Sequence, residues 1–127
     1  MNKKVLIVDD EPNILTLIEQ SLEGLEDGYG VELMTAQNGI DALEIIQQQM
    51  PNLVFLDLMI PNISGLDICK FVKKDMDMAN IYIVMLTARG QEQDKQKGLS
   101  VGVDFYMTKP FHPRDILAKS LDFLGLD

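Results

Sequence analysis

Short, uninterrupted apolar runs alternate along this chain with longer stretches in which apolar residues recur every three or four positions. A continuous apolar run is typical of a strand buried on both faces of a sheet, and the longer period is typical of a helix with one buried face. Parallel strands need crossover connections, which helices provide. The alternation therefore predicts an α/β domain, a doubly wound parallel sheet of five strands with helices on both faces.

The expected strands cover residues 5–8, 31–36, 53–56, 81–86 and 105–107. The expected helices cover residues 12–25, 40–49, 64–72, 91–99 and a last segment from 113 onward. Pro12 and Pro113 suit the first turn of a helix, while Ser64 and Asp67 predict a capping box for the third helix. An acidic residue ahead of Pro12 is expected to cap the first helix. Three glycines are expected to end that helix and form a loop, Gly24, Gly28 and Gly30.

Charged and hydroxyl residues follow the expected strands at the ends that would share one edge of the sheet. Asp9 and Asp10 follow the first strand, Asp57 the third and Thr87 the fourth, and the fifth strand leads to Lys109. In open α/β sheets, binding sites form outside the carboxyl ends of the strands, where the winding direction reverses. We therefore expect these side chains to gather there.

Carboxylates gathered at one edge favour a bound cation, because each close pair repels by about 4 kcal/mol at an effective dielectric near 20. Mg²⁺ prefers hard oxygen ligands, and carboxylates with a backbone carbonyl satisfy it. The chain has one cysteine and one histidine, so no Cys/His cluster competes for a softer metal. Cys69 is expected to be a small core residue, and His112 to have a structural or surface role at the start of the last helix.

The same residue types suit phosphoryl transfer, which needs a nucleophile, a metal on the transferred oxygens and fixed donors for the remaining charge. The carboxylate of Asp57 can form an acyl phosphate. Lys109 can set a cation against a phosphoryl oxygen, and the Thr87 hydroxyl can donate a hydrogen bond. The expected cofactor is Mg²⁺, beside an aspartyl nucleophile.

Charge and apolar content limit the partners and the compartment. The formal net charge is −9, which argues against direct nucleic-acid binding, because an acidic domain repels phosphates. The apolar run at residues 5–8 is too short for a signal peptide core or a membrane span, so no membrane contact is expected. A single cysteine permits no internal disulfide, which fits a reducing compartment. We expect a cytoplasmic protein.

Four segments, in this order and at these spacings, resemble the receiver domain of bacterial two-component response regulators over essentially the whole chain. They are VLIVDDEP at 5–12, LDLMIP at 56–61 followed by Ser64-Gly65, MLTA at 85–88 and YMTKPF at 106–111. The resemblance implies a flavodoxin-like (βα)5 fold and a single receiver domain over residues 1–127. This domain is either of the single-domain chemotaxis or phosphorelay type, or the receiver half of a larger regulator.

The resemblance also implies a role for each matching residue of the site. Asp57 would be the phospho-acceptor. Asp9, Asp10 and Asp57 would hold Mg²⁺ together with the main-chain carbonyl of Met59. Lys109 would bind the phosphoryl group.

The remaining implied roles concern switching and tuning. Thr87 would bind another phosphoryl oxygen, and Tyr106 would turn inward as Thr87 moves. Met59 and Arg89 flank the site and would tune the access of water to the acyl phosphate. The peptide bond between Lys109 and Pro110 is expected to be cis.

The implied partners are a sensor histidine kinase or phosphotransfer protein, and a downstream protein target or linked output domain. The domain would be a monomer or a phosphorylation-dependent dimer, and it would catalyse only its own phosphorylation and dephosphorylation. Its output surface would comprise residues 91–99, the fifth strand and the last helix. Phe105 and Lys119 depart from the acidic residue and the arginine common in receivers of winged-helix transcription factors, and so from the charge pairs of their dimer.

Three other functions compete with this reading. A flavodoxin-like electron carrier needs a Ser/Thr/Gly loop for the flavin phosphate after the first strand, where this chain has acidic residues. A haloacid-dehalogenase-type phosphatase carries a second aspartate two residues after its nucleophile, where this chain has Met59. A degenerate receiver would be a phosphorylation-independent docking module, although Asp9, Asp10, Asp57, Thr87 and Lys109 are all present.

Overall fold

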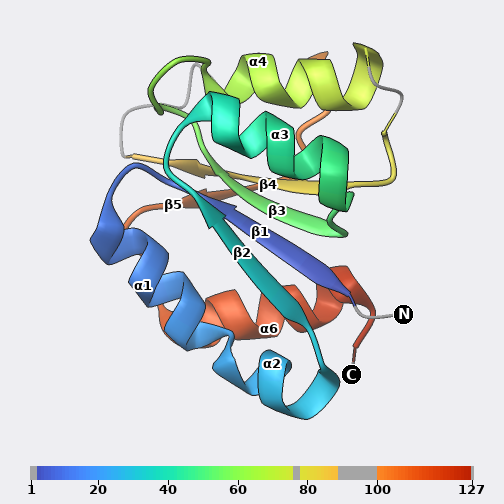
Figure 1. The fold of residues 1–127 in the computed structure, drawn as a ribbon. Coiled ribbons are helices and arrows are strands. Elements are labelled where there is room, and N and C mark those ends of the chain that lie inside the picture. The colour runs from blue at the N-terminus through green and yellow to red at the C-terminus, as the bar shows by residue number, and fades with distance from the viewer. Residues whose placement is uncertain (1–2, 76–77, 89–99, 127) are drawn as a thin grey trace.

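A single parallel sheet forms the centre of the computed structural model, which describes residues 3–75, 78–88 and 100–126 (Figure 1). Its strands lie in the order β2-β1-β3-β4-β5 and all pair in parallel. They are β1 (Lys4–Val8), β2 (Glu32–Ala36), β3 (Leu53–Asp57), β4 (Tyr82–Thr87) and β5 (Phe105–Thr108). The chain moves outward from β1 to β2 in one direction and from β3 to β5 in the other. The predicted doubly wound fold is therefore confirmed, and its winding reverses between β1 and β3.

Helices cover both faces of the sheet (Figure 1). One face is covered by α1 (Pro12–Ser21), α2 (Glu23–Tyr29) and α6 (Pro113–Leu124). The other face is covered by α3 (Gly39–Gln49) and α4 (Gly65–Lys70). Helix α4 continues into the π-helical turn η1 (Phe71–Asp75). The helix expected over 91–99 lies outside the described residues.

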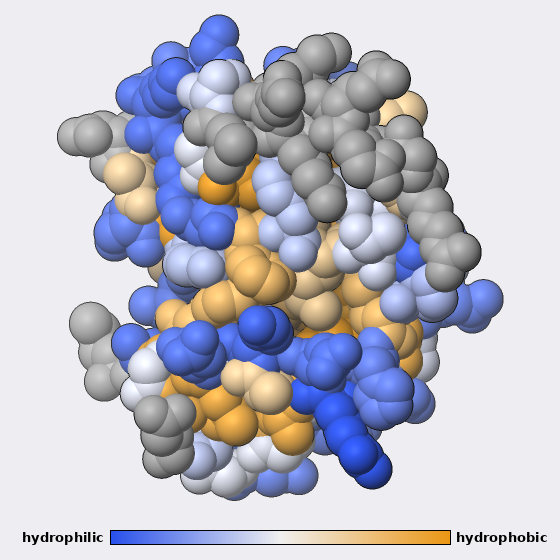
Figure 2. Space-filling model, turned by 180° about the vertical axis from the view of Figure 1, so that it is seen from behind, coloured by the Kyte–Doolittle hydropathy of each residue, from blue (hydrophilic) through white to orange (hydrophobic). Residues whose placement is uncertain are grey.

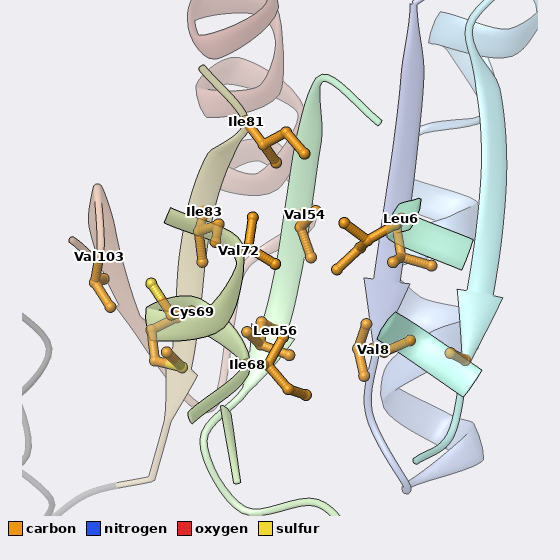
Figure 3. Close-up of a cluster of buried hydrophobic side chains, with 14 of the residues drawn as sticks. Leu6, Val8, Val54, Leu56, Ile68, Cys69, Val72, Ile81, Ile83 and Val103 are labelled. Atoms are coloured by element: carbon orange, nitrogen blue, oxygen red, sulfur yellow. The ribbon is translucent and has the colours of Figure 1, made fainter. Parts of the chain in front are cut away.

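Two apolar clusters, one on each face of the sheet, make up the core. Leu6, Val54 and Leu56 belong to the cluster that faces α3 and α4, and Figure 3 shows Leu56 of β3 beside Ile68 of α4. Their neighbours along the same strands, among them Val5, Ile7 and Phe55, point toward α1 and α6. Successive side chains of a strand point to opposite faces, so a strand with both faces covered must be apolar throughout.

The first helix differs from the expectation. The structure breaks it at Leu22, and Gly24 and Gly28, predicted to form a loop, lie within α2. Only Gly30 ends the helix, with a left-handed φ of 66°. Leu22 and Leu25 are both fully buried against the sheet. Their burial is worth about 1.5–3 kcal/mol each, which outweighs the roughly 1 kcal/mol that each helical glycine costs.

The helix caps also differ in detail. Glu11 precedes α1 and its side chain makes no capping bond with any residue that the structure describes, whereas Asp9 Oδ1 accepts a hydrogen bond from the Glu11 amide at 2.9 Å. The Ser64 hydroxyl accepts from the Asp67 amide at 3.2 Å, which is the Ser64 half of the capping box predicted for the start of α4. His112 begins α6 as predicted, and its Nδ1 accepts from the Arg114 amide at 3.2 Å.

Polar contacts connect α4 and η1 to the segment that precedes β5. The side chain of Lys73, only 8% exposed, lies 2.7 Å from Asp104 Oδ2, which also accepts from the Ile83 amide at 2.8 Å. The Cys69 thiol approaches the Val101 carbonyl at 3.6 Å. Cys69 is buried as predicted, and burial raises the pKa of its thiol to about 11. These contacts anchor the strand that leads to Lys109.

Candidate functional site

Four carboxylates meet at the carboxyl edge of β1 and β3, where the winding reverses. Asp9, Asp10 and Glu11 follow β1, and Asp57 is the last residue of β3. One carboxylate oxygen from each lies within 4.8 Å of the others. The structure thus brings together the three aspartates singled out from the sequence and adds Glu11. Glu11 belongs to the segment 5–12 that resembles receiver domains, but nothing in the sequence indicated that its side chain turns back to the site.

Asp9 is the most deeply buried of the four, with no exposed surface. Its Oδ1 is engaged by the Glu11 amide. Its Oδ2 has no hydrogen-bond partner among the described residues and contacts only the charge of Lys109, 3.0 Å away. A buried carboxylate oxygen with a single ion-pair partner still has lone-pair capacity, which a coordinated cation can use.

Lys109 places a positive charge beside three of the four carboxylates. Its Nζ lies 3.0 Å from Asp9 Oδ2, 3.3 Å from Asp57 Oδ2 and 3.4 Å from Glu11 Oε1. Burial lowers the pKa of the Lys109 ammonium, but pairing with Asp9 and Asp57 outweighs this, so that its pKa lies above 10.5. The ammonium is therefore charged at neutral pH. The Lys109–Pro110 peptide bond is cis, as predicted.

For Asp57, unlike Lys109, the cost of burying the charged form outweighs the favourable contacts that this form makes. Burial raises the pKa of its carboxyl from 3.8 to about 6, and the charge of Asp9 contributes in the same direction. The Met59 amide, which donates to Asp57 Oδ1 at 3.2 Å, and the Lys109 ammonium lower it only in part. These protein groups by themselves thus make an ionised Asp57 costly, and added positive charge at this edge would stabilise it.

A pocket of about 270 Å³ opens beside Asp57. It is lined by Asp10, Glu11, Asp57, Met59, Ala88 and Lys109. The Met59 side chain is 66% exposed at its mouth. Carboxylate oxygens with room for retained waters are the surroundings that Mg²⁺ prefers, and Asp9 Oδ2 keeps lone-pair capacity beside its ion pair with Lys109, so the residues fit this ion. Arg89, predicted to flank the site, lies outside the described residues.

The loop after Asp57 is held by a glycine for which sequence reasoning gave no role. Gly65 donates from its amide to the Leu58 carbonyl at 3.0 Å. A Cβ at this position would lie 2.5 Å from the Asp57 carbonyl oxygen and 3.0 Å from the Leu58 Cα. No side chain fits there without moving the backbone that carries the Asp57 carboxylate.

Replacing Gly65 with alanine should therefore displace this loop and lower the free energy of unfolding by about 1–3 kcal/mol, the usual cost of overpacking. Urea denaturation measures the loss, and the amide shifts of Leu58 and Met59 report the displacement. Gly28→Ala is the matched control, because a Cβ at Gly28 would meet no described atom within 4 Å apart from the backbone of its own helix α2. That change should stabilise the protein by roughly 0.5–1 kcal/mol. Equal effects of the two substitutions would contradict this role of Gly65.

Thr87 and Tyr106 lie on the neighbouring strands. Thr87 ends β4 and is 2% exposed; its hydroxyl lies 3.3 Å from that of Thr108. Among the described residues, no hydrogen bond joins Thr87 to the four carboxylates, although the next residue, Ala88, lines the pocket. Tyr106 is half-buried and packs against the core cluster on the α3/α4 face.

Aromatic side chains pack at the outer edge of β5 around Phe105, one of the two residues at which the sequence departs from the charge pairs of winged-helix regulators. The Phe123 ring of α6 lies 4.3 Å from that of Tyr82 and 5.3 Å from that of Phe105. The Lys119 ammonium sits 4.9 Å from the centre of the Phe105 ring. Figure 2, a view from behind, shows apolar side chains exposed between hydrophilic ones on this side of the molecule. Phe105 and Lys119 thus pack on each other as a cation–π pair.

The chain matches the family model described as the Response regulator receiver domain over residues 5–120. It is 44% identical over 119 residues to the alkaline phosphatase synthesis transcriptional regulatory protein PhoP of Bacillus subtilis, covering 94% of this chain and 47% of that protein. It is 41% identical over 119 residues to the phosphate regulon transcriptional regulatory protein PhoB of Pseudomonas aeruginosa, covering 94% and 50%.

A solved structure agrees over a comparable length. The BeF3-activated receiver domain of DrrB, a Thermotoga maritima regulator, is 32% identical and superimposes with a TM-score of 0.83, covering 98% of this chain and 99% of that one. The chain spans about half the length of PhoP and PhoB. In the part of the chain that the structure describes, no helix combines the length and apolar character needed to cross a membrane. The chain belongs to the response regulator receiver domains, the phospho-accepting signalling modules of two-component systems.

Proposed function

We propose that Asp57 is the residue that accepts the phosphoryl group, from the phosphohistidine of a sensor kinase or phosphotransfer protein. The observation that carries the proposal is the position of the Asp57 carboxylate. It borders the pocket, with Oδ1 held by the Met59 amide and Oδ2 by Lys109. An oxygen of this carboxylate would attack phosphorus in line as the phosphorus–nitrogen bond breaks, and the released imidazole would take up a proton.

Asp9, Asp10, Asp57 and the Met59 carbonyl would hold Mg²⁺. When bound, the ion supplies positive charge against the oxygens of the transferred group. Asp9 supports this assignment best, because its buried Oδ2 has no hydrogen-bond partner among the described residues. The raised pKa of Asp57 supports it as well, since the surrounding protein groups by themselves penalise the ionised form that the attack requires.

Lys109 would bind a phosphoryl oxygen, because its ammonium already lies 3.3 Å from Asp57 Oδ2. The new group adds about −1.5 to −2 charges and three acceptor oxygens. The Thr87 hydroxyl would rotate toward it, and Tyr106 would move into the space that Thr87 leaves. The output surface at β5 and α6 would then prefer a different partner, with a coupling of about 1–3 kcal/mol. The receiver would pass the signal to a downstream protein or a linked output domain.

Intact-mass measurement after incubation with acetyl phosphate and Mg²⁺ tests the proposal. The wild-type chain should gain the mass of one phosphoryl group, and Asp57→Asn should gain none, because an amide is too weak a nucleophile. Asp75→Asn, an exposed aspartate at the end of η1, should label like the wild type. Labelling of Asp57→Asn at the wild-type stoichiometry would refute the assignment. A folded wild-type chain that never labels would favour the phosphorylation-independent docking module.

A further inference from the structure

Two hydroxyl groups face each other across the last two strands, at the edge that carries the site. The Oγ1 atoms of Thr87 and Thr108 lie 3.3 Å apart, and either can be the donor. The two residues are register partners in the parallel pairing of β4 with β5. The preceding pair on the same face is Met85 with Tyr106, and both pack in the α3/α4 core cluster. The register of β4 and β5 therefore sets this side-chain contact, which lies on the same face of the sheet as Tyr106.

The two hydroxyls differ in their access to water. Thr108 is exposed, whereas Thr87 is 2% exposed. Water can replace a lost partner of Thr108 but reaches Thr87 poorly, so the contact matters more to Thr87. The Thr87 backbone is fixed as well, because its carbonyl accepts from the Lys109 amide at 2.7 Å. Rotation of the Thr87 side chain is then the movement open to it, and this rotation breaks the contact with Thr108.

We propose that Thr108 is a positioning residue that holds the Thr87 hydroxyl in its resting orientation. Switching then exchanges this hydrogen bond for one to the phosphoryl group, and Thr108 opposes the switched state. The proposal rests on the function proposed above, in which Thr87 binds a phosphoryl oxygen. A group that stabilises only one of two states shifts their equilibrium by its differential interaction with them. Removing the Thr108 hydroxyl should accordingly weaken the resting state alone.

Binding of beryllofluoride with Mg²⁺ to the full chain tests the proposal, followed by the amide resonances of Thr87 and Tyr106. Thr108→Val keeps the branched shape and removes the hydroxyl. It should bind beryllofluoride about two- to tenfold more tightly, the range expected for one net hydrogen bond. The resting resonances of Thr87 should also shift toward their bound positions. Thr108→Ser restores a hydroxyl and should behave as the wild type. Thr35→Val, an exposed threonine of β2, controls for an added methyl group.

A second measurement separates positioning from general stability. In a Thr87→Val background, Thr108→Val should leave beryllofluoride affinity unchanged, because the hydroxyl that it positions is gone. If Thr108→Val binds beryllofluoride with wild-type or weaker affinity, while wild-type binding still depends on Asp57, the positioning role is overturned and the proposed function stands. If the wild-type chain fails to bind beryllofluoride at all, the proposed function fails and takes this inference with it.

Discussion

Replacing Lys109 with methionine is expected to lower the free energy of unfolding of the metal-free protein by about 2–4 kcal/mol. The ammonium lies within 3.4 Å of Asp9, Asp57 and Glu11, and methionine keeps most of the stem while removing the charge. Asp9 is fully buried and would be left without a compensating charge. Urea denaturation in EDTA at pH 7.5 measures the loss.

The loss should shrink when Mg²⁺ is added, since the ion supplies positive charge to the same carboxylates. Lys70→Met, at an exposed lysine of α4, is the matched control and should change stability by less than about 0.5 kcal/mol. If Lys109→Met and Lys70→Met unfold at the same urea concentration, Lys109 does not stabilise the carboxylate cluster.

Asp57→Asn is expected to do the reverse and stabilise the metal-free protein above pH 6. The folded pKa of Asp57, about 6, lies above its usual value of 3.8. Its contribution to stability is therefore fully present below pH 3.8 and is lost as the pH rises through 6. A shift of this size corresponds to roughly 3 kcal/mol. Because this pKa already includes the attraction of Lys109, no further loss is subtracted, and the expected gain at pH 8 is about 1–3 kcal/mol.

Urea denaturation of wild type and Asp57→Asn in EDTA, at intervals from pH 4 to pH 8, measures this difference. It should be small at the acidic end and should grow between pH 4 and pH 7. Asp75→Asn, an exposed carboxylate outside the site, should show no comparable growth. A constant difference between wild type and Asp57→Asn across the range would mean that the Asp57 pKa is not raised.

The fold and most of the site could be predicted from the sequence, because both depend on local patterns. Continuous apolar runs such as Val5–Val8 indicate strands covered on both faces. A parallel sheet then brings the residues that follow those strands to a common edge. Asp9, Asp10, Asp57 and Lys109 meet there because of this topology. Their meeting could therefore be predicted without knowledge of any distance between them. The helix over 12–25 was predicted less well, since burial of Leu22 and Leu25 outweighed the cost of two glycines.

The tertiary structure alone decided how the side chains at that edge share their contacts. Glu11 turns back to Lys109, one Asp9 oxygen finds no hydrogen-bond partner in the part of the chain that the structure describes, and Gly65 approaches the Asp57 carbonyl too closely for any side chain. The pairing of Thr87 with Thr108 follows from the register of β4 and β5. A sequence pattern reports which face of an element is buried. It carries no measure of register or separation between segments that meet only after folding, and those quantities set the electrostatics of this site.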